Sequence, residues 1–156
     1  MLPGDGDILI DVCPLIDRRR TVALVVDDDP TSRLIAVRAL QRHGCETIEA
    51  GDGSEALAAL SVRWIPLAVV DLQMPGMGGM ELLRAIRADY PLTRCIVLTS
   101  SSSVSDALAV LKLGAVGFQT KPLELKRFNA LIGIAFDQLR SWTDQLNSMG
   151  QARNHR

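Results

Sequence analysis

From residue 21 onward, short apolar runs alternate along the chain with longer stretches whose apolar residues recur at helical spacing. The apolar runs are almost unbroken, which is the pattern of strands buried on both faces of a sheet. The predicted strands lie at 22–26, 45–49, 67–71, 95–99 and 115–120. The second run is more polar than the others, as expected of a strand at the edge of the sheet.

The stretches between these runs carry helix start and stop signals. Pro30 suits a first helical turn, and Gly44 and Gly114 follow the last periodic residues of two helices. The predicted helices lie at 30–43, 52–60, 80–86, 107–113 and from 123 onward. Five strands therefore alternate with five helices.

This alternation predicts an α/β fold in which parallel strands are joined by right-handed crossovers, giving a three-layer sandwich. The expected arrangement is a five-stranded parallel doubly wound sheet, flavodoxin-like, with strand order 2-1-3-4-5. We expect one folded domain at 21–140. Residues 1–20, interrupted by proline and glycine, are an expected N-terminal extension that is poorly ordered, and 141–156 extend the last helix and form a tail.

Composition narrows the function classes. With 17 basic and 18 acidic residues the net charge is −1, which gives no general attraction to nucleic acid or to a membrane surface. No apolar stretch approaches the roughly 20 residues of a membrane span. Three widely spaced cysteines without a CxxC motif argue against a disulfide framework or a zinc site, and the start does not resemble a signal peptide. We expect a cytoplasmic location.

Polar residues end four of the five predicted strands. Asp27, Asp28 and Asp29 follow the first strand. Asp71 ends the third strand, Thr99 ends the fourth, and Lys121 follows the fifth. In a sheet of this order the carboxyl ends of these strands share one crevice, where ligands bind. Crowded carboxylates favour a hard cation such as Mg²⁺. A further carboxylate, a hydroxyl and an ammonium can then accept and hold a phosphoryl group.

Taken singly, each residue also has an ordinary structural interpretation. Asp71 could be a solvated loop acid or a helix cap, Lys121 a surface lysine, and Phe118 a core residue. Asp29 is best interpreted as the cap of the helix that starts at Pro30. The joint pattern favours the phosphoryl acceptor.

Four motifs, in order, resemble the receiver (CheY-like) domain of two-component response regulators. They are Val-Val-Asp-Asp-Asp-Pro at 25–30, Val-Asp-Leu-Gln-Met-Pro-Gly-Met-Gly-Gly at 70–79, Leu-Thr-Ser at 98–100 and Gly-Ala-Val-Gly-Phe-Gln-Thr-Lys-Pro at 114–122. The resemblance covers residues 21 to about 140. It implies a domain that takes a phosphoryl group from a sensor histidine kinase or a histidine phosphotransfer protein, in the presence of Mg²⁺, and that catalyses only its own phosphorylation and dephosphorylation.

The resemblance also implies a role for single residues. Asp71 matches the phosphorylated residue, and Asp27 and Asp28 match the acidic pair that binds or orients Mg²⁺. Gln73 occupies the position that lends a backbone carbonyl to the metal, and Lys121 matches the phosphate-binding lysine. The remaining matches are the switch hydroxyl of Thr99, the mobile aromatic ring of Phe118, and Pro122, whose peptide bond is often cis in this family.

The departures from the family pattern are small. Ser100 stands where alanine is common, and Phe118 replaces a tyrosine, so that the switch is apolar. Gln73 and Ser101 occupy positions that influence the lifetime of the phosphoryl group, which leaves that lifetime open.

Two other functions remain open. Residues 26–31 also fit the strand end of haloacid-dehalogenase-like phosphatases, with Asp27 as nucleophile and Asp29 as general acid, although the later acidic pair of that family is missing. Alternatively, the chain is a DNA-binding regulator that lacks its output domain, since residues 123–156 carry no helix-turn-helix pattern and no nucleic-acid site is expected within this chain.

The last predicted helix carries more apolar residues than one sheet covers. A heptad-like seam with alternating spacings of 4 and 3 runs through Phe128, Ile132, Ala135, Leu139, Trp142, Leu146 and Met149. The first half of this seam is expected to pack on the sheet. The second half, from Leu139 to Met149, is expected to project and to form a homodimer, unless the helix end folds back or frays.

Overall fold

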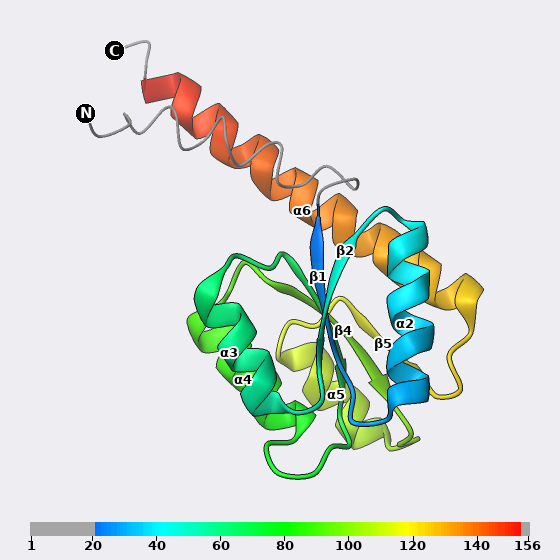
Figure 1. Cartoon of the computed structure of the whole chain (residues 1–156). Helices are drawn as coiled ribbons and strands as arrows, with labels where there is room; N and C mark the ends of the chain where they lie inside the picture. Colours follow the sequence, from blue (N-terminus) through cyan, green and yellow to red (C-terminus); the bar gives the residue numbers. More distant parts are fainter. Residues whose placement is uncertain (1–20, 154–156) are drawn as a thin grey trace.

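The computed structural model describes residues 21–153 and contains one five-stranded parallel sheet (Figure 1). The strands are β1 (Val22–Val26), β2 (Glu46–Ala50), β3 (Leu67–Asp71), β4 (Arg94–Thr99) and β5 (Gly117–Thr120). Their order is β2-β1-β3-β4-β5, so the predicted doubly wound topology is confirmed. The expectations for residues 1–20, including Cys13, and for 154–156 lie outside the described residues.

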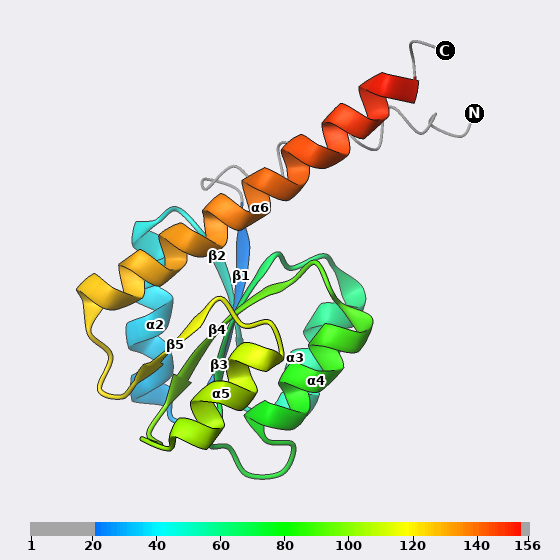
Figure 2. The ribbon, with the colours of Figure 1, turned by 180° about the vertical axis from the view of Figure 1, so that it is seen from behind.

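Within the part of the chain that the structure describes, five helices cover the two faces of this sheet. They are α2 (Pro30–Arg42), α3 (Gly53–Val62), α4 (Gly79–Asp89), α5 (Val104–Lys112) and α6 (Leu125–Arg153). Alternate residues of the strands point to opposite faces, so that Val25 packs with α2 and α6, whereas Leu24 packs with α3, α4 and α5. Figures 1 and 2 show α2 and α6 on one side of the sheet and the other three helices on the opposite side. The molecule is therefore a three-layer sandwich.

The residues predicted to start and stop helices lie at the helix ends in the structure. Asp29 and Asp52 accept backbone N–H groups at the starts of α2 and α3. Gly44 and Gly114 follow α2 and α5 with φ angles of 84° and 83°, the left-handed region that glycine enters without a steric penalty. These local choices explain why the helices end where the sequence predicts.

The predicted boundaries differ from the observed ones by at most three residues, the largest differences being the end of α4 and the start of α5. β5 begins at Gly117 rather than at residue 115, and Ala115 instead closes the turn with an N–H bond to the Val110 carbonyl. The last helix begins at Leu125 rather than at residue 123, and the Lys121–Pro122 peptide bond in the preceding turn is cis. The cis bond itself agrees with the sequence expectation.

The last helix, α6, runs for 29 residues and continues past the sheet (Figures 1 and 2). The first part of its predicted seam is confirmed as core, since Phe128, Ile132, Ala135 and Leu139 are buried on the sheet. Within residues 21–153, no helix has the length and apolar character needed to cross a membrane.

Candidate functional site

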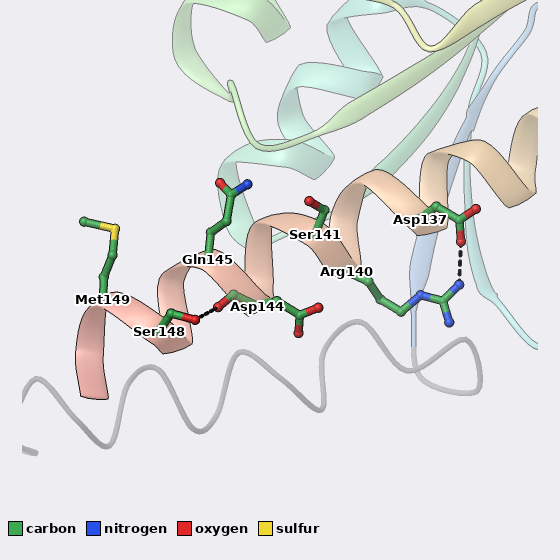
Figure 3. A pocket seen from close by; sticks show the side chains of 7 residues that line it. All are labelled: Asp137, Arg140, Ser141, Asp144, Gln145, Ser148 and Met149. Atoms are coloured by element: carbon green, nitrogen blue, oxygen red, sulfur yellow. Dashed lines mark hydrogen bonds and ion pairs between the residues drawn. The ribbon is translucent and has the colours of Figure 1, made fainter. Parts of the chain in front are cut away.

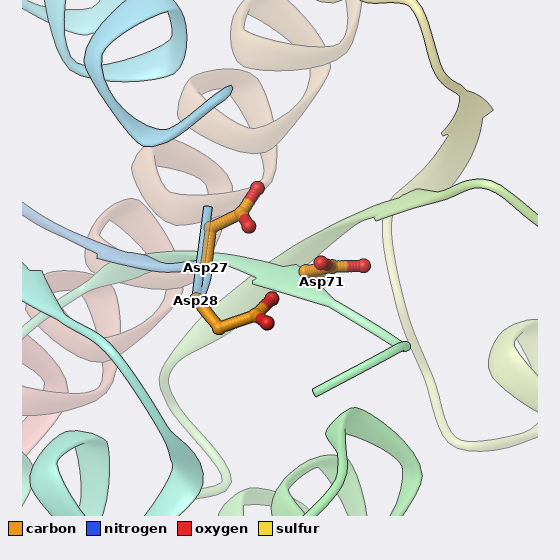
Figure 4. A group of neighbouring side chains, drawn as sticks. All are labelled: Asp27, Asp28 and Asp71. Carbon is orange, nitrogen blue, oxygen red and sulfur yellow. The ribbon is translucent and has the colours of Figure 1, made fainter. Parts of the chain in front are cut away.

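The carboxyl ends of β1 and β3 bring three aspartates together (Figure 4). One carboxylate oxygen from each of Asp27, Asp28 and Asp71 lies within 4.8 Å of the others. Asp27 and Asp71 are buried, with 2% and 3% of their surfaces exposed, whereas Asp28 is exposed. The structure thus assembles the acidic cluster expected at the point where the strand order reverses.

Lys121 is the cation of this cluster. Its Nζ donates to Asp27 Oδ2 at 2.8 Å and to Asp71 Oδ2 at 3.1 Å. The remaining oxygens accept backbone donors, since Asp27 Oδ1 accepts the N–H of Asp29 and Asp71 Oδ1 accepts the N–H of Gln73. A single lysine therefore bridges two buried carboxylates that belong to different strands.

Burial raises the pKa of Asp71 above 3.8, and the Asp27 charge acts in the same direction. The Gln73 N–H and the Lys121 ammonium oppose this rise without cancelling it. For Lys121 itself, burial lowers the pKa, but its bonds to the two carboxylates outweigh burial and raise the pKa above 10.5. The lysine is therefore protonated at neutral pH, whereas folding disfavours the charged form of Asp71.

Carboxylate oxygens at this spacing fit a hard divalent cation, because Mg²⁺ prefers oxygen ligands and keeps several waters. The Lys121 ammonium pairs with Asp27 and Asp71, and Asp28 adds a third carboxylate, so these four side chains have an excess of negative charge. The donor set consequently suits Mg²⁺, with Asp27, Asp28 and Asp71 as the side chains that would hold it.

Two residues that support the cluster were not foreseen from the sequence. Arg33, on the first turn of α2, donates to the Asp27 carbonyl oxygen at 2.7 Å and to Glu49 Oε1 at 3.0 Å. Gly79 lies so close to the backbone after Asp71 that an added Cβ would be 2.6 Å from the Cα of Leu72. The sequence does not mark Arg33, because an arginine on an amphipathic helix is ordinarily solvated, and the close approach at Gly79 leaves no signal beyond a glycine.

The Thr99 hydroxyl is turned toward its own loop. Its Oγ1 accepts the N–H of Ser101 at 3.0 Å, and the Ser101 hydroxyl donates to Asp106 of α5. The Gln73 side chain accepts the N–H of Ser100 at 3.1 Å, which connects the loop after β3 to the loop after β4. The predicted metal-binding loop and the predicted switch loop are therefore joined directly.

A cavity of about 350 Å³ lies between this loop, α5 and β5. Thr99 and Phe118 both line it, together with apolar residues of α5 such as Val110. Phe118 is half-buried. The space is thus available for a change of the Phe118 side chain, and the two predicted switch residues share it.

The residues predicted for a dimer helix divide into two pairs. Leu139 is buried in the core, and Trp142 packs against the same core, so the expectation that Trp142 projects without cover is wrong. The physical reason is that the sheet and its loops extend farther along α6 than the seam alone indicates. Leu146 and Met149 are 37% and 66% exposed and remain available.

A surface hollow of about 700 Å³ lies along the exposed side of α6 (Figure 3). It is lined by polar residues and Met149, and an ion pair joins Arg140 to Asp137 at 2.7 Å. Its residues come from α6, whereas those of the acidic cluster come from the ends of β1 and β3. The hollow and the acidic cluster are separate features.

Comparison with known proteins agrees with the geometry of the strand ends. The family model described as response regulator receiver domain matches residues 23–133. The chain is 34% identical over 116 residues to the DNA-binding transcriptional regulator NtrC of Salmonella typhimurium, covering 73% of this chain and 24% of that protein. It is also 34% identical over 117 residues to the DNA-binding response regulator MtrA of Mycolicibacterium smegmatis, covering 75% and 51%. The chain thus spans about a quarter to a half of these relatives.

A solved structure gives the same result. The CheY-like receiver domain protein of Methanospirillum hungatei superimposes with a TM-score of 0.73 at 26% identity, covering 78% of this chain and 97% of that chain. Neither the family model nor these relatives support the phosphatase alternative, and Asp29, its supposed general acid, is occupied as the cap of α2. The chain therefore belongs to the family of response regulator receiver domains.

Proposed function

We propose that Asp71 accepts a phosphoryl group from a phosphohistidine of a sensor histidine kinase or a histidine phosphotransfer protein, in a reaction that depends on Mg²⁺. One observation supports this most strongly: a buried carboxylate lies at the mouth of the sheet, beside two further aspartates and in contact with a lysine ammonium. Membership of the receiver family supports the same reaction.

In this proposal an oxygen of the Asp71 carboxylate attacks phosphorus. The new O–P bond forms as the N–P bond to the donor histidine breaks, and the histidine nitrogen retains the electron pair. Asp27, Asp28, Asp71 and the backbone carbonyl of Gln73 would hold Mg²⁺, which supplies positive charge for the phosphoryl oxygens when bound. The protein undergoes a change in its own covalent state rather than turning over a substrate.

Lys121 and Thr99 hold the transferred group. The Lys121 ammonium, which now bonds to Asp27 and Asp71, turns to one phosphoryl oxygen and keeps its proton because its pKa is raised. The Thr99 hydroxyl exchanges its bond with Ser101 for a bond to a second oxygen. Thr99 ends β4 and Lys121 directly follows β5, and these positions support the proposed roles.

The test is labelling by acetyl phosphate, followed by intact mass. We expect one phosphoryl group on the wild-type protein with Mg²⁺ and none without it. Asp71→Asn should not be labelled, whereas Asp89→Asn, an exposed acid on α4, should be labelled normally. Full labelling of Asp71→Asn would refute the assignment, and steady hydrolysis of a generic phosphate ester would favour a phosphatase instead.

Phosphorylation should also change the face formed by α5, β5 and α6. As the Thr99 hydroxyl turns to the phosphoryl group, the serine loop moves and Phe118 turns into the cavity beside it. Thr99→Ala should still be phosphorylated but should respond weakly in the spectrum of this face. A full wild-type response in that variant would contradict the coupling.

The phosphodonor protein would bind beside Asp71, over the start of α2 and the surrounding loops. Leu34 and Ile35 of α2 are large apolar residues that remain 45% and 44% exposed there. Such residues suit a protein partner, because their burial stabilises a complex. A donor of this kind places the protein in the cytoplasm, in keeping with the reduced, buried Cys45 and Cys95.

The exposed end of α6 is the proposed dimer contact. Leu146 and Met149 continue the seam of the helix, and both side chains remain exposed in the described part of the chain. Light scattering should give a dimer for the wild-type protein and a monomer for the double variant Leu146→Lys, Met149→Lys. A wild-type monomer at tens of micromolar, phosphorylated or not, would refute this contact.

A further inference from the structure

A second group of contacts lies at the opposite edge of the sheet, where β4 begins. The guanidinium carbon of Arg94 is 5.0 Å from the centroid of the Trp142 ring, which is the geometry of a cation–π contact. The Nη2 of Arg94 donates to the Gly114 carbonyl oxygen at 3.0 Å. One side chain therefore joins the start of β4, the turn between α5 and β5, and α6.

This part of the structure is packed rather than loosely apposed. Trp142 lies against the core shared by α2 and α6, and Thr143 beside it is buried, with its hydroxyl bonded to the Leu139 carbonyl. Among residues 21–153, the buried Nε of Arg94 has no hydrogen-bond partner, and burial lowers the pKa of this arginine. The arginine is thus held by Gly114 and Trp142 despite the cost of its burial.

The same turn connects back to the switch cavity. α5 lines that cavity and ends in the turn that carries Gly114, and β5 leaves the turn toward Phe118. A shift of α5 or β5 would move the Gly114 carbonyl. Because a guanidinium is planar and its donors are fixed relative to one another, Arg94 would transmit this movement to the Trp142 ring.

We infer that the Arg94–Trp142 contact couples the state of the Asp71 site to the part of α6 that continues past the sheet. This inference rests on the proposed phosphorylation of Asp71. α6 continues for 11 residues beyond Trp142, roughly 16 Å at the helical rise, so a small rotation at the ring becomes a larger displacement at the helix end. The contact is a positioning contact and takes no part in phosphoryl transfer.

The chain supplies a matched control. Arg87 of α4 donates to the Lys112 carbonyl oxygen at 2.7 Å, so it also holds the end of α5 through a backbone carbonyl. Arg87 belongs to α4, which covers the opposite face of the sheet from α6 (Figures 1 and 2). Replacing each arginine by glutamine therefore separates the coupling to α6 from a general loosening of α5.

The reporter is Trp142 itself. The sequence contains two tryptophans, so Trp64→Phe leaves Trp142 as the single indole fluorophore. In that background, beryllofluoride with Mg²⁺ serves as a stable stand-in for the phosphoryl group. We expect a saturable change in Trp142 emission that is absent from Asp71→Asn.

Arg94→Gln should reduce the amplitude of this response at least about threefold, a size typical of residues that modulate coupling. Arg87→Gln should retain the full amplitude. By reciprocity, Arg94→Gln should also change the midpoint of the beryllofluoride titration. Arg94→Lys keeps the positive charge but loses the planar guanidinium, so it should also give a reduced response. This variant tests the coupling if Arg94→Gln does not fold.

A full response in Arg94→Gln or Arg94→Lys would overturn the inference, and so would equal losses in the Arg94 and Arg87 variants. Labelling by acetyl phosphate is measured in parallel on the Trp64→Phe protein. Labelling without any change of Trp142 emission would contradict this inference alone. Loss of both labelling and emission change would contradict the proposed function and this inference with it.

Discussion

Charged side chains lie in different environments at the carboxyl edge of the sheet, where the strands end, and at the amino edge, where the strands begin. At the carboxyl edge three aspartates face one lysine, and two of these aspartates are buried. At the amino edge the half-buried Arg94 lies between a tryptophan ring and a backbone carbonyl. The first edge has an excess of negative charge that a cation can relieve, whereas at the second the arginine is held by an aromatic ring and a carbonyl oxygen. The difference indicates that the carboxyl edge is built for a reaction and the amino edge for positioning.

Lys121→Met gives the largest expected effect and acts on the carboxyl edge. Two buried carboxylates would lose their cation, which should reduce the free energy of unfolding by about 3 kcal/mol at neutral pH. Urea titration measures the loss, and Lys126→Met, an exposed lysine on the first turn of α6, is the control. Mg²⁺ should recover part of the loss. An unchanged midpoint for Lys121→Met would show that the lysine does not neutralise the cluster.

Trp142→Ala tests the amino edge. The ring is half-buried, so we expect a loss of about 2 kcal/mol, below the ~3 to 5 kcal/mol of a fully buried aromatic residue. Met149 lies two seam positions farther along α6 and is exposed, so Met149→Ala should change stability little. Equal effects of the two substitutions in chemical denaturation would contradict the packed junction.

Asp71→Asn should stabilise the protein in the absence of Mg²⁺, by about 1 kcal/mol at neutral pH, as expected where a site is kept strained for function. The sign follows from the raised pKa of Asp71, since folding disfavours its charged form. The advantage of the variant should therefore shrink as pH falls through the raised pKa and vanish below the ordinary value of 3.8. An advantage that grows on acidification would contradict the assigned shift. Stability curves of both proteins across this pH range provide the measurement.

Gly133→Ala has the smallest expected effect and concerns α6, the helix that spans both edges. A Cβ added at Gly133 would meet no heavy atom within 4 Å. The substitution should therefore stabilise the helix by roughly 0.5 to 1 kcal/mol through the lower entropy of the unfolded chain. Thermal unfolding measures the gain, and destabilisation would show that α6 packs more closely here than the structure indicates.

The carboxyl edge could be predicted from the sequence because each of its residues ends or directly follows a strand. Asp27, Asp71 and Thr99 are marked by an abrupt change from apolar to polar at a strand end, and the strand order then brings them together. Arg33 has no such mark, since an arginine on an amphipathic helix is ordinarily a solvated residue. Its role depends on the carbonyl of Asp27, which only the folded chain places within reach.

The amino edge could not be predicted, because its partners come from three separate elements. Trp142 continues the same heptad spacing as Leu146, so the pattern alone does not distinguish a ring that packs on the domain from a side chain that projects. Arg94 was expected to precede a strand and carries no motif. Seam positions specify a face of a helix, whereas the length over which the domain covers that face depends on the loops at the sheet edge.

The most direct test of the central claim locates the phosphoryl group on the chain. The protein is treated with acetyl phosphate and Mg²⁺ and then with borohydride, which reduces an aspartyl phosphate to homoserine, and the peptides are sequenced by mass spectrometry. The account predicts homoserine at position 71 and intact aspartate at positions 27 and 28. Homoserine at position 27 or 28, or a labelled protein with intact Asp71, would contradict it.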